Sequence, residues 1–279
     1  MAYNLRDLAK RAGNRRRLIK LRPIRVRPAS VRELERITAL ALEPWESNTA
    51  RIVGSYRAPG YTGMRDSAEE TSRLIELIVL ETNRALVRIT ARIKTWAGGV
   101  ERIHRKAWAE SVLAATSIDL TTILSPFDMQ ETVEAAIQRN ASLVKNVSEA
   151  TRGRIADIVF RGVQQRTPTR DVAKQLREAV DLERKRSVRI AADQATKLYS
   201  ALDRARQEEA GIEHFIWRHS RKARPRAAHV ARDGVLYKWR AGIDGPGRDP
   251  PPQGDFPGEL PFCGCQPQAV ILDDSGKPI

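Results

Sequence analysis

Apolar residues recur at helical spacing along much of the first 210 positions of this chain. The stretch SVRE at 30–33 is typical of a capping box, in which Ser30 caps a helix and Glu33 reaches back, so a helix is expected to run to about Trp45. YRAPGYTG at 56–63 predicts a loop. Beyond it, the apolar face of a long helix is formed by Ile75, Ile78, Val79, Thr82, Leu86, Ile89 and Ile93.

This long helix is expected to begin and end at local signals. The acidic residues of DSAEE at 66–70 suit the positive end of the helix dipole. The paired glycines of AGGVE at 97–101 should end the helix, and a separate helix should then continue to about Ser117. LSPFD at 124–128 predicts another break, with Asp128 capping the helix that follows.

The pattern after that break is helical to about residue 165, with an interruption expected near Ser148. Thr167-Pro168-Thr169 predicts a turn, because proline is tolerated in the first turn of the next helix. A long basic helix is expected over 182–210 and should end at Gly211. Its inner face is predicted to contain Val188, Ala191, Ala192, Ala195, Leu198, Leu202 and Ala205.

The pattern changes after Gly211, where aromatic residues and a stretch dense in proline and glycine appear. EHFIW at 213–217, VLYKW at 235–239 and QAVIL at 268–272 are typical of short strands. RPRAAHVARDG, between the first two, predicts a short helix that ends at Gly234. The expected fold is therefore mainly α, with a long-helix body followed by a small α+β module. The predicted domains are a basic arm at 1–29, a helical domain at 30–210 and the module at 211–279.

The charge of the chain indicates the kind of partner that it binds. The chain of 279 residues carries 49 Lys and Arg against 34 Asp and Glu, a net charge of +15 that favours a polyanion such as nucleic acid or an anionic membrane surface. No apolar run approaches the length of a membrane span. The candidate DNA contacts are cations of the arm and of the outer face of the basic helix: Arg15, Arg16, Arg17, Arg184, Lys185, Arg186 and Arg189.

Four residues of the module have the chemistry of a metal site: His219, His229, Cys263 and Cys265. Two imidazoles and two thiolates suit a structural zinc site, although the C-x-C spacing is less usual than paired C-x-x-C knuckles. Two other interpretations stay open: buried cysteines without a ligand, and a Cys263–Cys265 disulfide that would close a tight ring. Two cysteines do not make a disulfide framework, so a reducing compartment is expected.

Catalysis is not expected. A cysteine–histidine nucleophile needs an orienting third group and an oxyanion hole. The sequence contains no nucleophile elbow, HExxH, P-loop or paired-carboxylate signature, and the Asp233-Gly234 pair after the short helix is typical of a turn. We therefore predict that the chain is not an enzyme.

The module carries a family resemblance. Its pattern W-x2-S-x3-R-x-R-x2-H-x3-DG, followed by PG-x4-C-x-C, resembles the C-terminal domain of the phage Mu F-like head morphogenesis family, the minor head proteins of tailed phages. GVQQRTPTRDVAKQL at 162–176 also fits, and the resemblance covers about 150–275. The matching residues are Trp217, Ser220, Arg224, Arg226, His229, Asp233, Gly234, Pro257, Gly258, Cys263 and Cys265.

Two positions depart from the family pattern. Lys222 stands where the family often has an acidic residue, five positions after the tryptophan, and Gly264 stands where the family usually has an arginine between the cysteines. Both departures make a shared enzymatic role less expected in this chain.

The resemblance implies a structural role inside a virion. Family members are minor capsid components at the portal vertex, implicated in head assembly and in the packaging and ejection of DNA. It implies as partners the portal protein, the major capsid or scaffold proteins and non-specifically bound double-stranded DNA. The expected location is the capsid interior, after assembly in the host cytoplasm. The alternatives are a metal-dependent hydrolase built on the His/Cys cluster and a free cytoplasmic nucleic-acid-binding protein.

Overall fold

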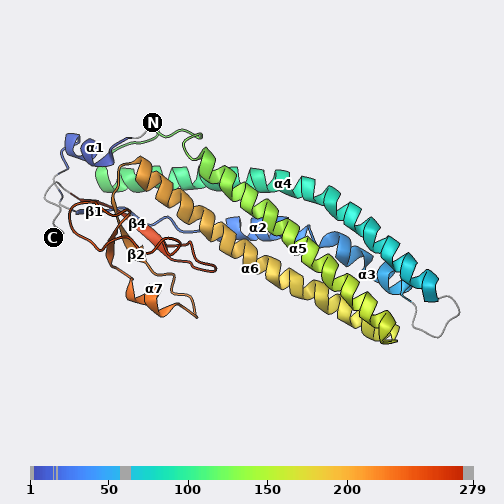
Figure 1. The fold of residues 1–279 in the computed structure, drawn as a ribbon. Helices are drawn as coiled ribbons and strands as arrows, with labels where there is room; N and C mark the ends of the chain where they lie inside the picture. The colour runs from blue at the N-terminus through green and yellow to red at the C-terminus, as the bar shows by residue number, and fades with distance from the viewer. Residues whose placement is uncertain (1–2, 15, 17, 57–63, 273–279) are drawn as a thin grey trace. The chain divides into compact units, whose positions relative to one another are not determined.

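The computed structural model describes residues 3–14, 16, 18–56 and 64–272. Long helices dominate it and a small four-stranded sheet involves the C-terminal region, which confirms the predicted fold class (Figure 1). None of the described helices is long and apolar enough to cross a membrane. In chain order the elements are α1 Leu5–Arg11, β1 Leu18–Lys20, α2 Pro28–Ala39, α3 Glu43–Ser55, α4 Met64–Thr116, α5 Gln130–Gln164, α6 Thr169–Glu209, β2 His214–Arg218, α7 Ala227–Ala231, β3 Leu236–Lys238 and β4 Gln266–Leu272.

The residues group into two compact units, each made of several chain segments. Unit 1 comprises 1–30, 97–136 and 193–279, and unit 2 comprises 31–96 and 137–192. The three long helices each contribute one part to each unit. The predicted division into arm, helical domain and module follows the chain in order and stays a prediction.

Unit 2 is a helical assembly with an aliphatic core. Its parts of α4, α5 and α6 lie side by side (Figure 1). Core residues come from four helices, for example Trp45 of α3, Ile78 of α4, Ile155 of α5 and Leu176 of α6. The predicted turn between α5 and α6 is confirmed, and the hydroxyl of Tyr56 donates a 2.7 Å hydrogen bond to the carbonyl oxygen of Thr167 within it.

Several predicted helix boundaries are wrong. The helix α4 continues through Gly98 and Gly99, because the neighbouring Ala97 and Val100 are buried and this packing outweighs the cost of glycine in a helix. The helices α5 and α6 are likewise unbroken, and Ser148 is buried inside α5. Asp128 precedes α5 by two residues, and its carboxylate accepts a hydrogen bond from the amide of Ser125 instead of capping the helix.

The first predicted helix is two helices. Residue Ser30 lies inside α2, which begins at Pro28, and its hydroxyl is 3.3 Å from that of Tyr199. The chain turns after Ala39, and α3 starts with Pro44 in its first turn, where proline has no need of an amide hydrogen. The loop predicted at 56–63 lies outside the described residues, apart from Tyr56.

Unit 1 contains an antiparallel sheet with strand order β1-β4-β2-β3. The three strands predicted in the module and its short helix α7 are confirmed. The fourth strand, β1, comes from the N-terminal segment and was not predicted. One face of the sheet packs an aromatic core that includes Phe215, Trp217 and Trp239, while the other face packs Ile216 and Val270.

The C-terminal half of α6 joins this sheet through polar contacts. Residue Gln207 is fully buried, where its amide nitrogen donates to the carbonyl of Pro267 at 2.9 Å and its oxygen accepts from the indole of Trp239 at 3.1 Å. The preceding residue of α6, Arg206, forms a buried ion pair with Glu101 of α4 at 2.6 Å. The helix then ends as predicted, with Gly211 at a φ of +67°.

Candidate metal centre

One His/Cys group with metal-ligand chemistry forms among the described residues of unit 1. The group comprises His229, Cys263 and Cys265, all buried, with one candidate ligand atom from each within 4.8 Å of the others. The imidazole Nδ1 of His229 is 3.5 Å from the sulfur of Cys263 and 3.7 Å from that of Cys265. The helix α7 supplies the histidine, and the loop before β4 supplies both cysteines.

The other ring nitrogen of His229 is held by a carboxylate. Its Nε2 lies 2.8 Å from Asp255, which also accepts a 2.7 Å hydrogen bond from Arg232. Burial opposes ionisation of Asp255, yet the hydrogen bonds from Arg232 and His229 bring the pKa of its carboxyl below the ordinary value. An ionised Asp255 needs a donor, so the arrangement places the proton on Nε2 and turns the lone pair of Nδ1 toward the sulfurs.

The two cysteine thiols shift each other's pKa in opposite directions. A hydrogen bond from the thiol of Cys265 lowers the pKa of Cys263 to about 5, against the opposing effect of burial, and the backbone amides of Cys265 and Gly258 lower it further. The same bond, together with burial, raises the pKa of Cys265. These opposite shifts favour the thiolate at Cys263, and a thiolate is the form that binds metals.

Three polar contacts hold the loop before β4 that carries the cysteines, the cysteine loop. Lys222 donates to the carbonyl of Phe262 at 3.0 Å and Arg226 donates to that of Pro261 at 3.0 Å. The carboxylate of Asp193, on α6, accepts from the amide of Phe262 at 2.5 Å. These bonds secure a strained backbone, because Phe262 has a φ of +59°.

Gly258 is required where the chain turns toward this loop. It has a φ of +84°, and a Cβ built on it would lie 2.2 Å from the hydroxyl of Ser200. Both the backbone conformation and the close approach to α6 therefore exclude a side chain. The adjacent Pro257 is buried.

Residues 153–267 match the family described as phage Mu protein F like protein. This Mu F-like segment is what the chain shares with that family, and it covers less than half of the chain. A curated protein of Haemophilus influenzae, described as uncharacterized, is 31% identical over 162 residues, which are 57% of this chain and 34% of the relative. The chain thus spans about a third of that relative's length. No solved structure matches the chain.

The Mu F-like segment includes all three residues of the metal-type group. His219 was predicted as a fourth ligand but is not in the group. Its Nδ1 accepts a 3.1 Å hydrogen bond from the amide of Arg221, and its own amide donates to Asp233 at 3.0 Å. Asp255 was missed, because an acidic residue in a proline- and glycine-rich loop gives no sequence signal.

The other motif residues of the Mu F-like segment surround the group. The ring of Trp217 packs edge-on against that of His229, with centroids 5.0 Å apart. The amide of Gly234, at a φ of +79°, donates to the carbonyl of Trp217 at 2.9 Å. Arg224 is exposed. The two departures from the family pattern face each other, since a Cβ on Gly264 would lie 2.7 Å from Cε of Lys222.

The predicted DNA contacts lie away from this group in the sequence. Arg15 and Arg17 are outside the described residues, while Arg16 is exposed. The four cations predicted on α6 are all exposed. Arg184 pairs with Glu46 and Arg186 pairs with Glu183. Lys185 and Arg189 form no ion pair with any described residue.

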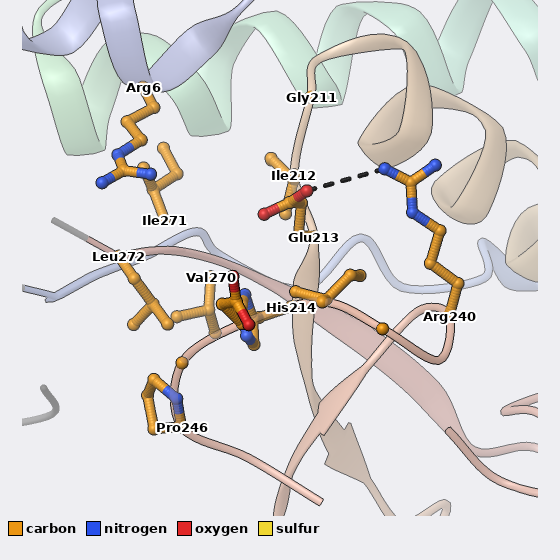
Figure 2. Close-up of a pocket in the computed structure, with 14 residues that line it drawn as sticks. Arg6, Gly211, Ile212, Glu213, His214, Arg240, Pro246, Val270, Ile271 and Leu272 are labelled. Carbon is orange, nitrogen blue, oxygen red and sulfur yellow. Dashed lines mark ion pairs between the residues drawn. The ribbon is translucent and has the colours of Figure 1, made fainter. Parts of the chain in front are cut away.

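A pocket of about 460 Å³ lies beside the sheet in unit 1 (Figure 2). Figure 2 shows Arg6 and Arg240 on opposite sides of it, with Arg240 paired to Glu213 at 3.6 Å. The Nε2 of His214 is buried there without a hydrogen-bond partner among the described residues. Burial lowers the pKa of His214, so its imidazole is neutral at pH 7.

Proposed function

We propose that this chain is a minor head protein of a tailed phage, acting in head morphogenesis and in the packaging or ejection of DNA. The observation that carries the proposal is the match of residues 153–267 to the phage Mu protein F family. Several motif residues of that segment meet around His229, which supports a shared fold and role. The matched relative has no described activity, so the proposal rests on the family alone.

The proposed place of action is the portal vertex inside the capsid, reached from the host cytoplasm during assembly. The proposed partners are the portal protein and the major capsid or scaffold proteins. Double-stranded DNA is a further partner, bound without sequence preference. A net charge of +15 supports contact with packaged phosphates, because cations neutralise the backbone regardless of sequence.

We further propose that His229, Cys263 and Cys265 bind a zinc ion with a structural role. Two zinc ligands in tetrahedral arrangement, one nitrogen and one sulfur, lie about 3.6 Å apart, as follows from ordinary zinc–ligand bond lengths. The two nitrogen–sulfur distances in the group are 3.5 and 3.7 Å. The carboxylate behind His229 matches the outer partner that metal-bound histidines commonly have. Zinc bound there would link α7 to the cysteine loop.

Particle composition tests the proposed function. Particles produced from the genome that encodes this chain are purified by density gradient, and their proteins are identified by mass spectrometry with and without crosslinking. The chain should be present in DNA-filled heads and should crosslink to the portal protein. DNA-filled, infectious particles made after deletion of its gene would overturn the proposal.

A further inference from the structure

A basic pocket of about 820 Å³ lies beside the cysteine loop in unit 1. Four cationic side chains line it, and the only carboxylate in its lining among the described residues is Asp233. That carboxylate already accepts a hydrogen bond from the amide of His219. The cations come from two distant parts of the sequence and are Arg25, Arg218, Arg221 and Lys222.

None of these four cations forms an ion pair with a described carboxylate. Arg218 uses its Nε to donate to Gln268 at 2.7 Å, and Lys222 donates to the carbonyl of Phe262. Both contacts are with neutral acceptors, so they orient the side chains and leave the positive charges uncompensated. Four uncompensated charges around one hollow repel each other unless an anion joins them.

The strand β4 holds the two sides of the pocket together. The side chain of Gln268, 7% exposed, donates to the carbonyl of Leu21 at 2.7 Å while it accepts from Arg218. Two residues earlier, Gln266 donates to the carbonyl of Ile24 at 3.0 Å. These bonds fix the 21–25 segment beside the end of β2, so the convergence of the cations is built into the fold.

The cations continue beyond the pocket as a row. A second hollow, of about 240 Å³, shares Pro23 and Arg25 with it and is also lined by Arg22 and Arg27. Along this segment Leu21 and Ile24 are buried while the three arginines are exposed. A row of arginines suits a chain of phosphates better than one small anion, because guanidinium groups bind phosphate oxygens in pairs.

We propose that this basic pocket and the adjoining arginine row bind the phosphodiester backbone of DNA, and that they form the main DNA contact of the chain. The inference rests on the proposed function, in which DNA is a partner, and it moves the contact away from the outer face of α6. Two of the four cations there are already paired with Glu46 and Glu183.

Two variants with equal charge change test the proposal in the full-length chain. The pocket variant carries Arg25→Gln, Arg221→Gln and Lys222→Gln, and the helix variant carries Arg184→Gln, Lys185→Gln and Arg189→Gln. Binding to a labelled duplex is measured by fluorescence anisotropy over a range of salt concentrations. We expect the pocket variant to lose about 10- to 100-fold in affinity, with a shallower salt dependence, and the helix variant to lose less than about threefold.

Two sets of controls test whether the variants are folded and whether the bound ligand is DNA. Circular dichroism should show that both variants keep the helical content of the wild type. Unlabelled duplexes of any sequence should displace the labelled DNA, whereas inorganic phosphate and polyglutamate at equal charge should not. Equal losses in the two variants, an unchanged pocket variant, or displacement by polyglutamate would overturn the inference. The proposed head function would survive any of these results, because it is decided by particle composition.

Discussion

The two units of this protein have cores of opposite character. Unit 2 packs mainly aliphatic residues from four helices, with Trp45 and Tyr56 as its aromatic members. The sheet of unit 1 packs five aromatic residues with two cysteines on one face, and it depends on polar contacts to its loops. A helical core distributes its stability over many similar contacts, whereas a small sheet with long loops depends on a few specific ones.

The buried ion pair of unit 1 should give the largest effect. The substitution Arg206→Ala leaves Glu101 buried without its 2.6 Å partner, which should cost about 3–5 kcal/mol in the free energy of unfolding. The matched control is Arg105→Ala, because Arg105 approaches the same carboxylate only to 3.8 Å and is more exposed. Urea denaturation followed by circular dichroism should show less than about 1 kcal/mol for the control. Equal losses would contradict the assignment.

In the aliphatic core, Ile78→Ala should cost about 2–5 kcal/mol, because the side chain is fully buried among α3, α5 and α6 residues. On the same helix, Val87 is 73% exposed, and Val87→Ala should change stability by less than about 0.5 kcal/mol. The same denaturation experiment measures both. If Ile78→Ala lowered the free energy of unfolding no more than its control, Ile78 would not be packed in the core of unit 2.

The turn before the cysteine loop offers a test of specific packing. The substitution Gly258→Ala adds overlap with Ser200 to the cost of a positive φ, which together should destabilise unit 1 by about 2–4 kcal/mol. Gly254 has the same kind of φ, +83°, with open space around it. The control Gly254→Ala should therefore cost only the backbone term of about 1–2 kcal/mol. Thermal unfolding of both proteins measures the difference, and its absence would refute the close approach.

The pH-dependent contribution of His214 to the free energy of unfolding should be the smallest of these effects. Its folded pKa is lowered by burial, so the native state disfavours the proton that the unfolded state accepts. Its neutral form stabilises the fold above the unfolded pKa of about 6.5, and that contribution is lost as the pH falls below it. Relative to His214→Asn, the wild type should lose at most about 1.4 kcal/mol per pH unit between pH 6.5 and 5. A constant difference from pH 8 to pH 5 would exclude this role.

Local sequence patterns predicted most of the helices and strands, but they did not predict which strands pair with each other. The strands around Trp217, Tyr237 and Val270 were predicted because short apolar runs and turn residues are local signals. The strand β1 was missed, since its three residues lie in an arginine-rich segment and pair with Val270–Leu272 at the far end of the chain. Tertiary packing likewise decides that α4 continues through Gly98, against the local preference.

Residue types alone predicted which side chains could bind a metal, but only partly which of them lie close together. Three of the four predicted members of the candidate site meet in space, because the fold brings His229 of α7 next to the loop that holds Cys263 and Cys265. The motif spacing does not distinguish His219, whose ring nitrogen stabilises a turn, from a ligand. Asp255 joins the site through loop geometry, which a single sequence does not encode locally.

The central proposal for this site is that His229, Cys263 and Cys265 bind a zinc ion that links α7 to the cysteine loop. Purified protein and three variants, Cys263→Ser, His229→Asn and His219→Asn, are measured by inductively coupled plasma mass spectrometry. We predict about one zinc per chain in the wild type and in His219→Asn, and almost none in the other two. A folded wild type without zinc, or loss of zinc in His219→Asn alone, would contradict the claim.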